Sequence, residues 1–173
     1  RLASDKAQIL FNNDFDIIDG PNAPEVEITE LENEFIFSFL NVNSDKVENY
    51  QDTTTNTDDK DLVYRFQGYI VYQLKDATVS STELYDLDKA RVVFQCDIKD
   101  GVTALINNEP DAVIGRKIPK LMVEGSDGGI EHTFSIKQDA FATGANKALV
   151  NYSPYYFMVL SYSSLINDPG KVE

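Results

Sequence analysis

The 173-residue sequence contains no tryptophan, one cysteine and one histidine. Because one cysteine cannot form an internal disulfide, the fold must be held together without one. A single cysteine and a single histidine also cannot supply the usual ligand set of a zinc site. No apolar run approaches the roughly 20 residues of a membrane-spanning helix. We therefore expect neither a disulfide scaffold nor a zinc domain, and no membrane insertion.

Basic residues are also scarce, with 15 Lys and Arg against 29 Asp and Glu and a formal net charge of -14. A surface that binds the phosphates of nucleic acid must be basic, and anionic membranes likewise attract basic segments. The charge therefore predicts no nucleic-acid partner. It favours solubility and leaves room for a divalent cation.

The chain begins with Arg1 rather than Met, so we expect a piece of a longer protein. Its length suits one domain with insertions, and no internal repeat is visible. A turn signal at Asp19–Pro21 ends the first segment. We expect residues 1–20 to form an N-terminal linker segment and residues 21–173 to form one domain.

Residues that alternate between apolar and polar dominate the pattern, which is typical of strands with one buried face. The residues expected on buried faces are Phe35, Phe37 and Phe39; Val92, Phe94, Cys96 and Ile98; and Ile130, His132, Phe134 and Ile136. The expected strands are Glu25–Glu30, Phe35–Leu40, Val63–Leu74, Arg91–Ile98, Ile130–Ile136 and Tyr155–Tyr162. Six strands with little helix predict an all-β fold of two packed sheets, because one sheet cannot cover its own apolar face.

Two stretches resemble the fibronectin type III domain. Phe66–Tyr72 is similar to the third strand of that family, where a Gly-Tyr pair precedes alternating apolar residues, and Leu149–Val159 has the family's Leu followed by Tyr six residues later. The resemblance implies a fibronectin type III/immunoglobulin-like β-sandwich. It also implies that Tyr155 is the tyrosine-corner residue, whose hydroxyl bonds an upstream backbone group, and that Phe39 replaces the family's core Trp.

Longer phrases resemble a module of large secreted proteins of Bacteroidota, which the type IX secretion system often exports. These phrases are Asp19–Pro24, Tyr72–Ala77, Asp88–Arg91, Gln95–Lys99 and Phe141–Gly144. This resemblance, unlike the composition, implies an extracellular or cell-surface location.

The chain departs from the fibronectin pattern in two ways. That family needs only about 100 residues, so we expect long insertions at Asp76–Ala90 and Lys99–Gly129. No clear strand follows Tyr162, so the last strand lies outside the chain or another segment takes its place. An unfilled sheet edge is a docking site for another strand.

The candidate chemical groups favour structural roles. His132 stands beside Phe134 on an apolar face, which indicates a core-edge histidine rather than a member of a catalytic triad. Cys96 alternates with Phe94 and Ile98, which indicates a buried and inert thiol. We expect no catalytic residue and no cofactor, so the chain is not expected to be an enzyme.

The clustered carboxylates have three alternative interpretations, which are a catalytic pair, a calcium site and a solvated loop. They gather at Asp58, Asp59 and Asp61 in a polar loop over residues 50–61, and at Asp86 and Asp88. Such pairs resemble glycosidase acids, but acidic loops are usually just solvated. A structural calcium ion is an alternative, although no DxDxDG pattern is present.

The loop over residues 50–61 also carries a modification signal. Asp52-Thr53-Thr54 is similar to the O-glycosylation acceptor of secreted Bacteroidota proteins, so a glycan attached there is a further hypothesis.

Tyr155–Tyr162 is apolar on both faces, so something must cover its second face. We expect the cover to be one of the insertions or the segment Ile9–Ile18, and a neighbouring domain is the alternative.

By analogy with its fold, the chain is expected to be a structural or interaction module that serves spacing, docking or adhesion. Its partners would be neighbouring domains of the same chain or another surface protein. The rival hypothesis is a carbohydrate-binding module, for which Tyr50, Tyr64 and Tyr85 are the candidate aromatic residues.

Overall fold

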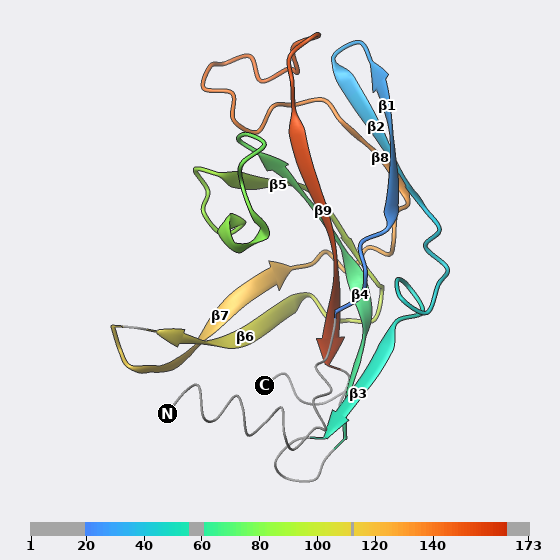
Figure 1. Cartoon of the computed structure of the whole chain (residues 1–173), viewed down its shortest axis with the longest axis vertical. Helices are drawn as coiled ribbons and strands as arrows, with labels where there is room; N and C mark the ends of the chain where they lie inside the picture. The colour runs from blue at the N-terminus through green and yellow to red at the C-terminus, as the bar shows by residue number, and fades with distance from the viewer. Residues whose placement is uncertain (1–19, 56–60, 112, 166–173) are drawn as a thin grey trace.

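The computed structural model describes residues 20–55, 61–111 and 113–165, and these residues form an all-β fold. The expected linker over residues 1–19 lies outside them. The strands are β1 (Glu25–Leu31), β2 (Glu34–Leu40), β3 (Gln51–Thr55), β4 (Asp61–Leu74), β5 (Ala90–Asp97), β6 (Ala104–Asp111), β7 (Arg116–Glu124), β8 (Thr133–Ile136) and β9 (Tyr156–Leu165). A single 3-10 turn, η1, covers Ser81–Glu83. All strand pairs are antiparallel (Figure 1).

Two sheets build the body of the protein. The first has the order β1-β2-β8. The second is organised around β4, which pairs with β9 along one edge and with β3 and then β5 along the other. All six expected strands are present, although β8 begins at Thr133 rather than at Ile130.

Aromatic side chains pack the two sheets face to face. Phe94 of β5 stacks on Phe134 of β8 with ring centroids 3.6 Å apart. Phe39 of β2 lies 4.7 Å from Tyr69 of β4, and Phe37 of β2 meets Phe157 of β9 edge-on at 5.1 Å. Each contact joins one sheet to the other, as in a β-sandwich, and Phe39 occupies the core as expected.

The expected faces of β5 are wrong at two residues, Val92 and Val93. The register against β4 shifts so that Val71 faces Phe94 while Tyr72 faces Val92, which leaves Val93 as an extra residue in a β-bulge. Val93 and Phe94 consequently both pack against the core between the sheets, and Val92 is exposed. Simple alternation cannot anticipate a bulge, because it assumes strict period two.

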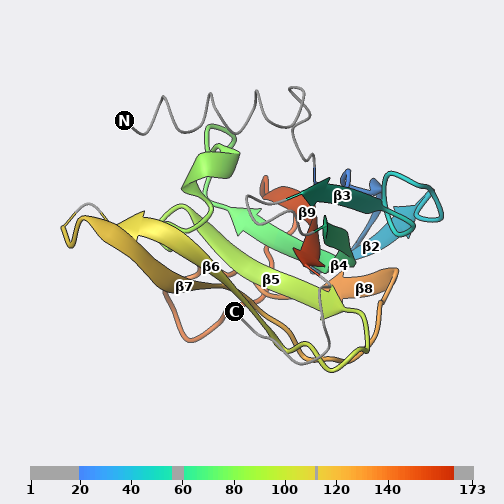
Figure 2. The same cartoon turned by 90° about the horizontal axis from the view of Figure 1, so that it is seen from below.

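Three strands were not expected from the sequence. The polar segment after Tyr50, interpreted as a loop, begins with β3, which pairs with the start of β4. The insertion after Ile98 contains the hairpin of β6 and β7, which pair with each other and with no other described strand. Figures 1 and 2 both show this hairpin extending away from the two sheets.

The insertion over residues 75–89 covers the outer face of the second sheet. Its Val79 and Leu84 are buried against Ile70, Tyr72 and Leu74 of β4. The outward residues of β9 pack against the same cluster, and they are Met158, Leu160 and Tyr162. The expectation that an insertion covers this face is therefore confirmed, whereas the alternative segment Ile9–Ile18 lies outside the described residues.

A glycine allows β4 and β9 to approach each other closely. A Cβ atom at Gly68 would overlap the carbonyl oxygen of Cys96 and lie 2.6 Å from the hydroxyl oxygen of Tyr162. The position follows the bulge at Phe66/Gly68 in the β4–β9 register. Only glycine fits between β5 and the Tyr162 ring.

Gly68→Ala should lower the free energy of unfolding by about 1–3 kcal/mol, because the added methyl group forces its neighbours to shift. Gly20→Ala is the matched control, since nothing lies within 4 Å of the Cβ position there. Urea unfolding of both variants measures the difference. Equal stability of the two variants would show that the β4–β9 contact is looser than described.

Candidate functional site

The single histidine lies at the edge of the core and pairs with an acid. The His132 Nε2 atom lies 2.6 Å from Oε1 of Glu48, and the Tyr69 hydroxyl donates to the same oxygen at 2.9 Å. Burial, together with this bond, raises the pKa of Tyr69. The His132 side chain is 44 % exposed. The expected core-edge position of His132 is confirmed, whereas its expected place on a buried face is wrong because its ring is partly exposed where it pairs with Glu48.

The only cysteine of the chain lies opposite Tyr69 in the register of β4 and β5. The Sγ atom of Cys96 donates to the carbonyl oxygen of Glu131 at 3.7 Å. Burial raises the pKa of the Cys96 thiol, which disfavours the reactive thiolate. The expected buried thiol is confirmed.

A buried carboxylate holds the base of the β6–β7 hairpin. Asp97 is almost completely buried and accepts hydrogen bonds from the backbone N–H groups of Ser126 at 3.2 Å and Asp127 at 3.0 Å. Asp127 in turn accepts from the N–H groups of Asp100 and Gly101, at 2.8 and 2.9 Å. These carboxylates satisfy backbone donors where the chain enters and leaves the hairpin.

Two buried glutamines fasten other loops to β4. Gln67 donates to Asp100 at 3.1 Å and accepts from the Ser164 hydroxyl at 2.7 Å. Gln73 donates to Asp139 at 2.7 Å and accepts from the backbone N–H of Ala140 at 2.8 Å. Because each buried amide is paired, β4 can carry polar groups inside the fold at little cost.

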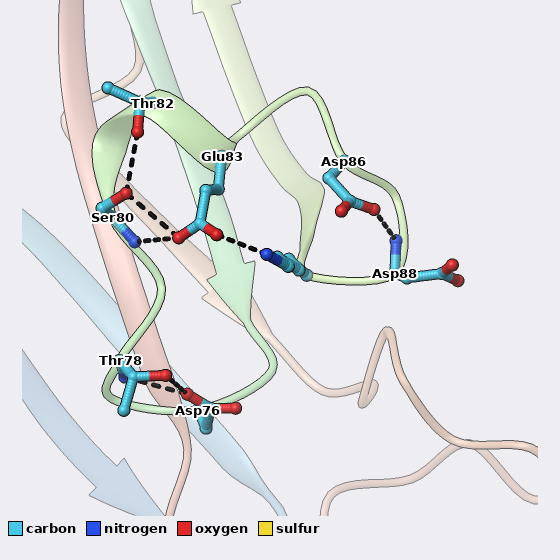
Figure 3. A network of polar contacts seen from close by, with 8 residues as sticks. Asp76, Thr78, Ser80, Thr82, Glu83, Asp86 and Asp88 are labelled. Carbon is cyan, nitrogen blue, oxygen red and sulfur yellow. Dashed lines mark hydrogen bonds and ion pairs between the residues drawn. The ribbon is translucent and has the colours of Figure 1, made fainter.

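The acidic insertion after β4 is a set of local turns (Figure 3). Asp76 accepts from the N–H and hydroxyl of Thr78, and Asp86 accepts from the N–H of Asp88. Glu83 accepts from the N–H of Ser80 at 3.0 Å and pairs with Lys89. These bonds lower the pKa of Glu83 to about 2, with the bond from Lys89 as the largest cause.

The carboxylates do not form a metal site in the part of the chain that the structure describes. No group of three or more His, Cys, Asp or Glu side chains is arranged there to hold an ion. Asp58 and Asp59 lie outside that part, as does the side chain of Asp61. The calcium hypothesis for that loop therefore stays a prediction.

The three candidate tyrosines do not share one platform. Tyr50 packs against the core between the sheets. Tyr85 lies on the opposite, outer face of the second sheet, with Nζ of Lys120 4.5 Å from its ring centroid. Tyr64 lies in β4, opposite Asp52 of β3. A flat sugar ring needs coplanar exposed aromatics, which these positions do not provide together.

The hydroxyl of Tyr155 makes the bond expected of it. It accepts from the backbone N–H of Val150 at 2.8 Å, five residues upstream. Leu149 is buried next to this turn, and the Tyr155 ring lies edge-on to Phe35 at 5.7 Å. The contact ties the turn before β9 to the first sheet.

An apolar groove of about 380 Å³ lies between the insertion, the outer face of β4 and β5, and strand β7. Its floor includes Ile70 and Tyr72. On its walls Leu87 is 72 % exposed and Leu121 is 50 % exposed. Sequence analysis missed this groove, because its walls come from two insertions without strong patterns.

No family model, curated protein or solved structure matches this chain in the three comparisons made with known proteins. Among the described residues, no helix has the length and apolar character needed to cross a membrane.

Asp97→Asn should destabilise the protein by about 1–3 kcal/mol, because the amide NH₂ would face the N–H donors that the carboxylate now accepts from. Hydrogen exchange should accelerate in β6 and β7 more than in β1 and β2. Asp88→Asn, at an exposed carboxylate, is the matched control. Unchanged exchange in the hairpin would contradict the anchoring role of Asp97.

The Glu83 carboxylate should titrate at a pH of about 2 rather than 4.5. Because its pKa is lower in the folded than in the unfolded state, its stabilising effect on the insertion is complete above about pH 4.5 and is lost as the pH falls toward 2. NMR titration of the Glu83 side chain measures this. Lys89→Ala should move the midpoint upward, and an unshifted midpoint near 4.5 in the unmodified protein would disprove the pairing.

Proposed function

We propose that this chain is a non-catalytic interaction module of a secreted or surface-exposed bacterial protein, which acts in spacing, docking or adhesion. The exposed apolar groove beside the β6–β7 hairpin is the observation that carries this proposal. Leu87, Leu121 and Val92 stand at its rim with half or more of their surface exposed. Exposed apolar side chains gathered around a groove mark a surface for protein contact.

The hairpin itself supports a docking role. An isolated two-stranded ribbon is marginally stable in water, yet this one extends from the body and is fastened at its base by Asp97 and Asp127. At its tip Val113 and Ile114 are exposed. Exposed apolar side chains at the tip of an anchored ribbon support a docking role.

A fibronectin type III-like identity is part of the proposal. The β1-β2-β8 sheet facing a sheet with β5, β4 and β9 supports it, as does the bond from Val150 to Tyr155. The proposed extracellular or cell-surface location, the origin in Bacteroidota and the export by type IX secretion rest on the resemblance of the sequence phrases alone.

The rival carbohydrate-binding function has less support. Of its candidate residues, Tyr85 alone is strongly exposed, and it stands beside the groove. The proposed O-glycosylation at Asp52–Thr54 concerns an exposed Thr53 in β3, so an attached glycan would stand on a strand rather than in a loop.

Site-specific photocrosslinking tests the interaction role. A photoreactive amino acid at Leu87 or Leu121, in the full-length protein in its native cells, should give covalent adducts with a protein. The same probe at Thr78, which is exposed on the other part of the insertion, should give none. A glycan array probed with the isolated chain should stay blank. Absence of adducts at both groove positions, or glycan binding lost on Tyr85→Ala, would refute the proposal.

A further inference from the structure

Strand β9 has one edge that no described strand covers. It pairs with β4 from Tyr156 to Leu165, and no other strand of residues 20–165 that the structure describes lies along its second edge. In an antiparallel strand, alternate residues direct their N–H and C=O groups to each side. The second edge of β9 therefore presents a row of backbone donors and acceptors.

This edge lacks the features that protect other sheet edges. Exposed edge strands usually carry charged residues or proline, or they are very short. The ten residues of β9 include no charged residue and no proline. By contrast, of the two outer strands of the first sheet, β8 is only four residues long and β1 carries three glutamates, which are Glu25, Glu27 and Glu30.

The side chains of β9 are also incompletely covered on both faces. Strand β4, which has strands along both edges and apolar clusters against both faces, is buried at every position from Phe66 to Leu74. In β9 the inward Phe157 and Val159 and the outward Met158 and Leu160 contact the two apolar clusters but remain partly exposed. An added strand would complete the burial of both faces.

We propose that the free edge of β9 binds an extended strand of a partner protein, with uncharged residues in the paired stretch and Lys or Arg on either side. This inference rests on the proposed interaction function. The net charge of -14 favours a basic partner and opposes a second copy of this chain. The uncharged β9 requires an uncharged, apolar paired stretch, since both of its faces are apolar.

The docking site is the first half of the strand. At Ser161 the side-chain hydroxyl donates to the carbonyl oxygen of Asn22 at 2.8 Å, so the segment leading to β1 already approaches the edge there. Tyr156–Leu160 is free of such a contact among the described residues. Pairing would use backbone hydrogen bonds over about five residues, as in other cases of strand addition.

Hydrogen exchange with a defined peptide tests the proposal. The probe is a synthetic peptide of about five alternating Val and Thr residues between pairs of Lys. Its addition to the whole chain should slow exchange of the amides in Tyr156–Leu160 that face away from β4 and leave β1 unchanged. The same peptide with a central Pro should not bind, and a version with Glu in place of Lys should bind more weakly. The difference between Lys and Glu peptides should shrink in high salt.

A matched pair of variants tests whether the peptide binds at the first half of β9. Tyr156→Lys puts a positive charge at an exposed position of the edge and should weaken binding of the Lys peptide by about tenfold or more, since the strand would bury an unpaired charge. Tyr152→Lys, in the fully exposed turn before β9, should leave binding unchanged. Circular dichroism and thermal unfolding of both variants identify any loss of fold.

Each other occupant gives a distinct result that overturns the inference. Protection of the amides in Tyr156–Leu160 that face away from β4, in the monomer before any peptide is added, means that the chain covers its own edge. Protection that grows with protein concentration, together with a dimer in sedimentation, means a second copy. No protection, or equal binding of the Pro peptide, means no strand addition. If photocrosslinks at Leu87 persist in any of these cases, the interaction function stands and only the β9 site fails.

Discussion

The structure depends on the burial of β4 from Phe66 to Leu74. This strand has neighbours on both edges and apolar clusters against both faces, with Tyr69 and Val71 toward the facing sheet and Ile70 and Tyr72 toward the insertion. A strand buried on both faces cannot follow the polar-apolar alternation of a half-exposed strand. Its cover must come from elsewhere in the chain, and on the outer face the segment over residues 75–89 supplies it.

Burial of β4 also explains where the polar side chains act. Gln67 and Gln73 project from the buried strand and are satisfied by Asp100 and Asp139 in loops that are distant in sequence. Asp97 on the neighbouring strand does the same for the base of the hairpin. A buried polar group without a hydrogen-bond partner would destabilise the fold. Each of these hydrogen-bonded pairs therefore fixes the position of the loop that it joins. The carboxylates nearest the core are thus occupied in holding loops.

The surface of the protein divides into acidic and apolar parts. Acidic side chains such as Asp76 and Asp86 form local turns in the solvent. The groove is lined mostly by apolar side chains, with Glu124 as the charged residue of its lining, and β9 contains no charged residue. In a chain of net charge -14, such largely uncharged regions are where a partner can approach without removing many carboxylates from water. Both the proposed docking surfaces are of this kind.

Much of the β-sandwich follows from local sequence, and the candidate sites largely do not. Alternation placed Phe35, Phe37 and Phe39 on the inner face of β2, and the segment around Tyr155 predicted its bond to the preceding turn. These features need only neighbours within one strand or turn. Alternation failed at Val93, where a bulge depends on the partner strand, and it did not reveal the β6–β7 hairpin.

The sequence by itself determined the fold class, the absence of a disulfide and the excess of negative charge. Tertiary structure alone decided that His132 meets Glu48 across 84 residues, that Asp97 anchors a hairpin, and that two insertions enclose a groove. The physical reason is the distance along the sequence over which each feature is decided. Strand periodicity is a property of adjacent residues, whereas pairing of polar groups and exposure of an edge depend on which distant segments come to lie beside them.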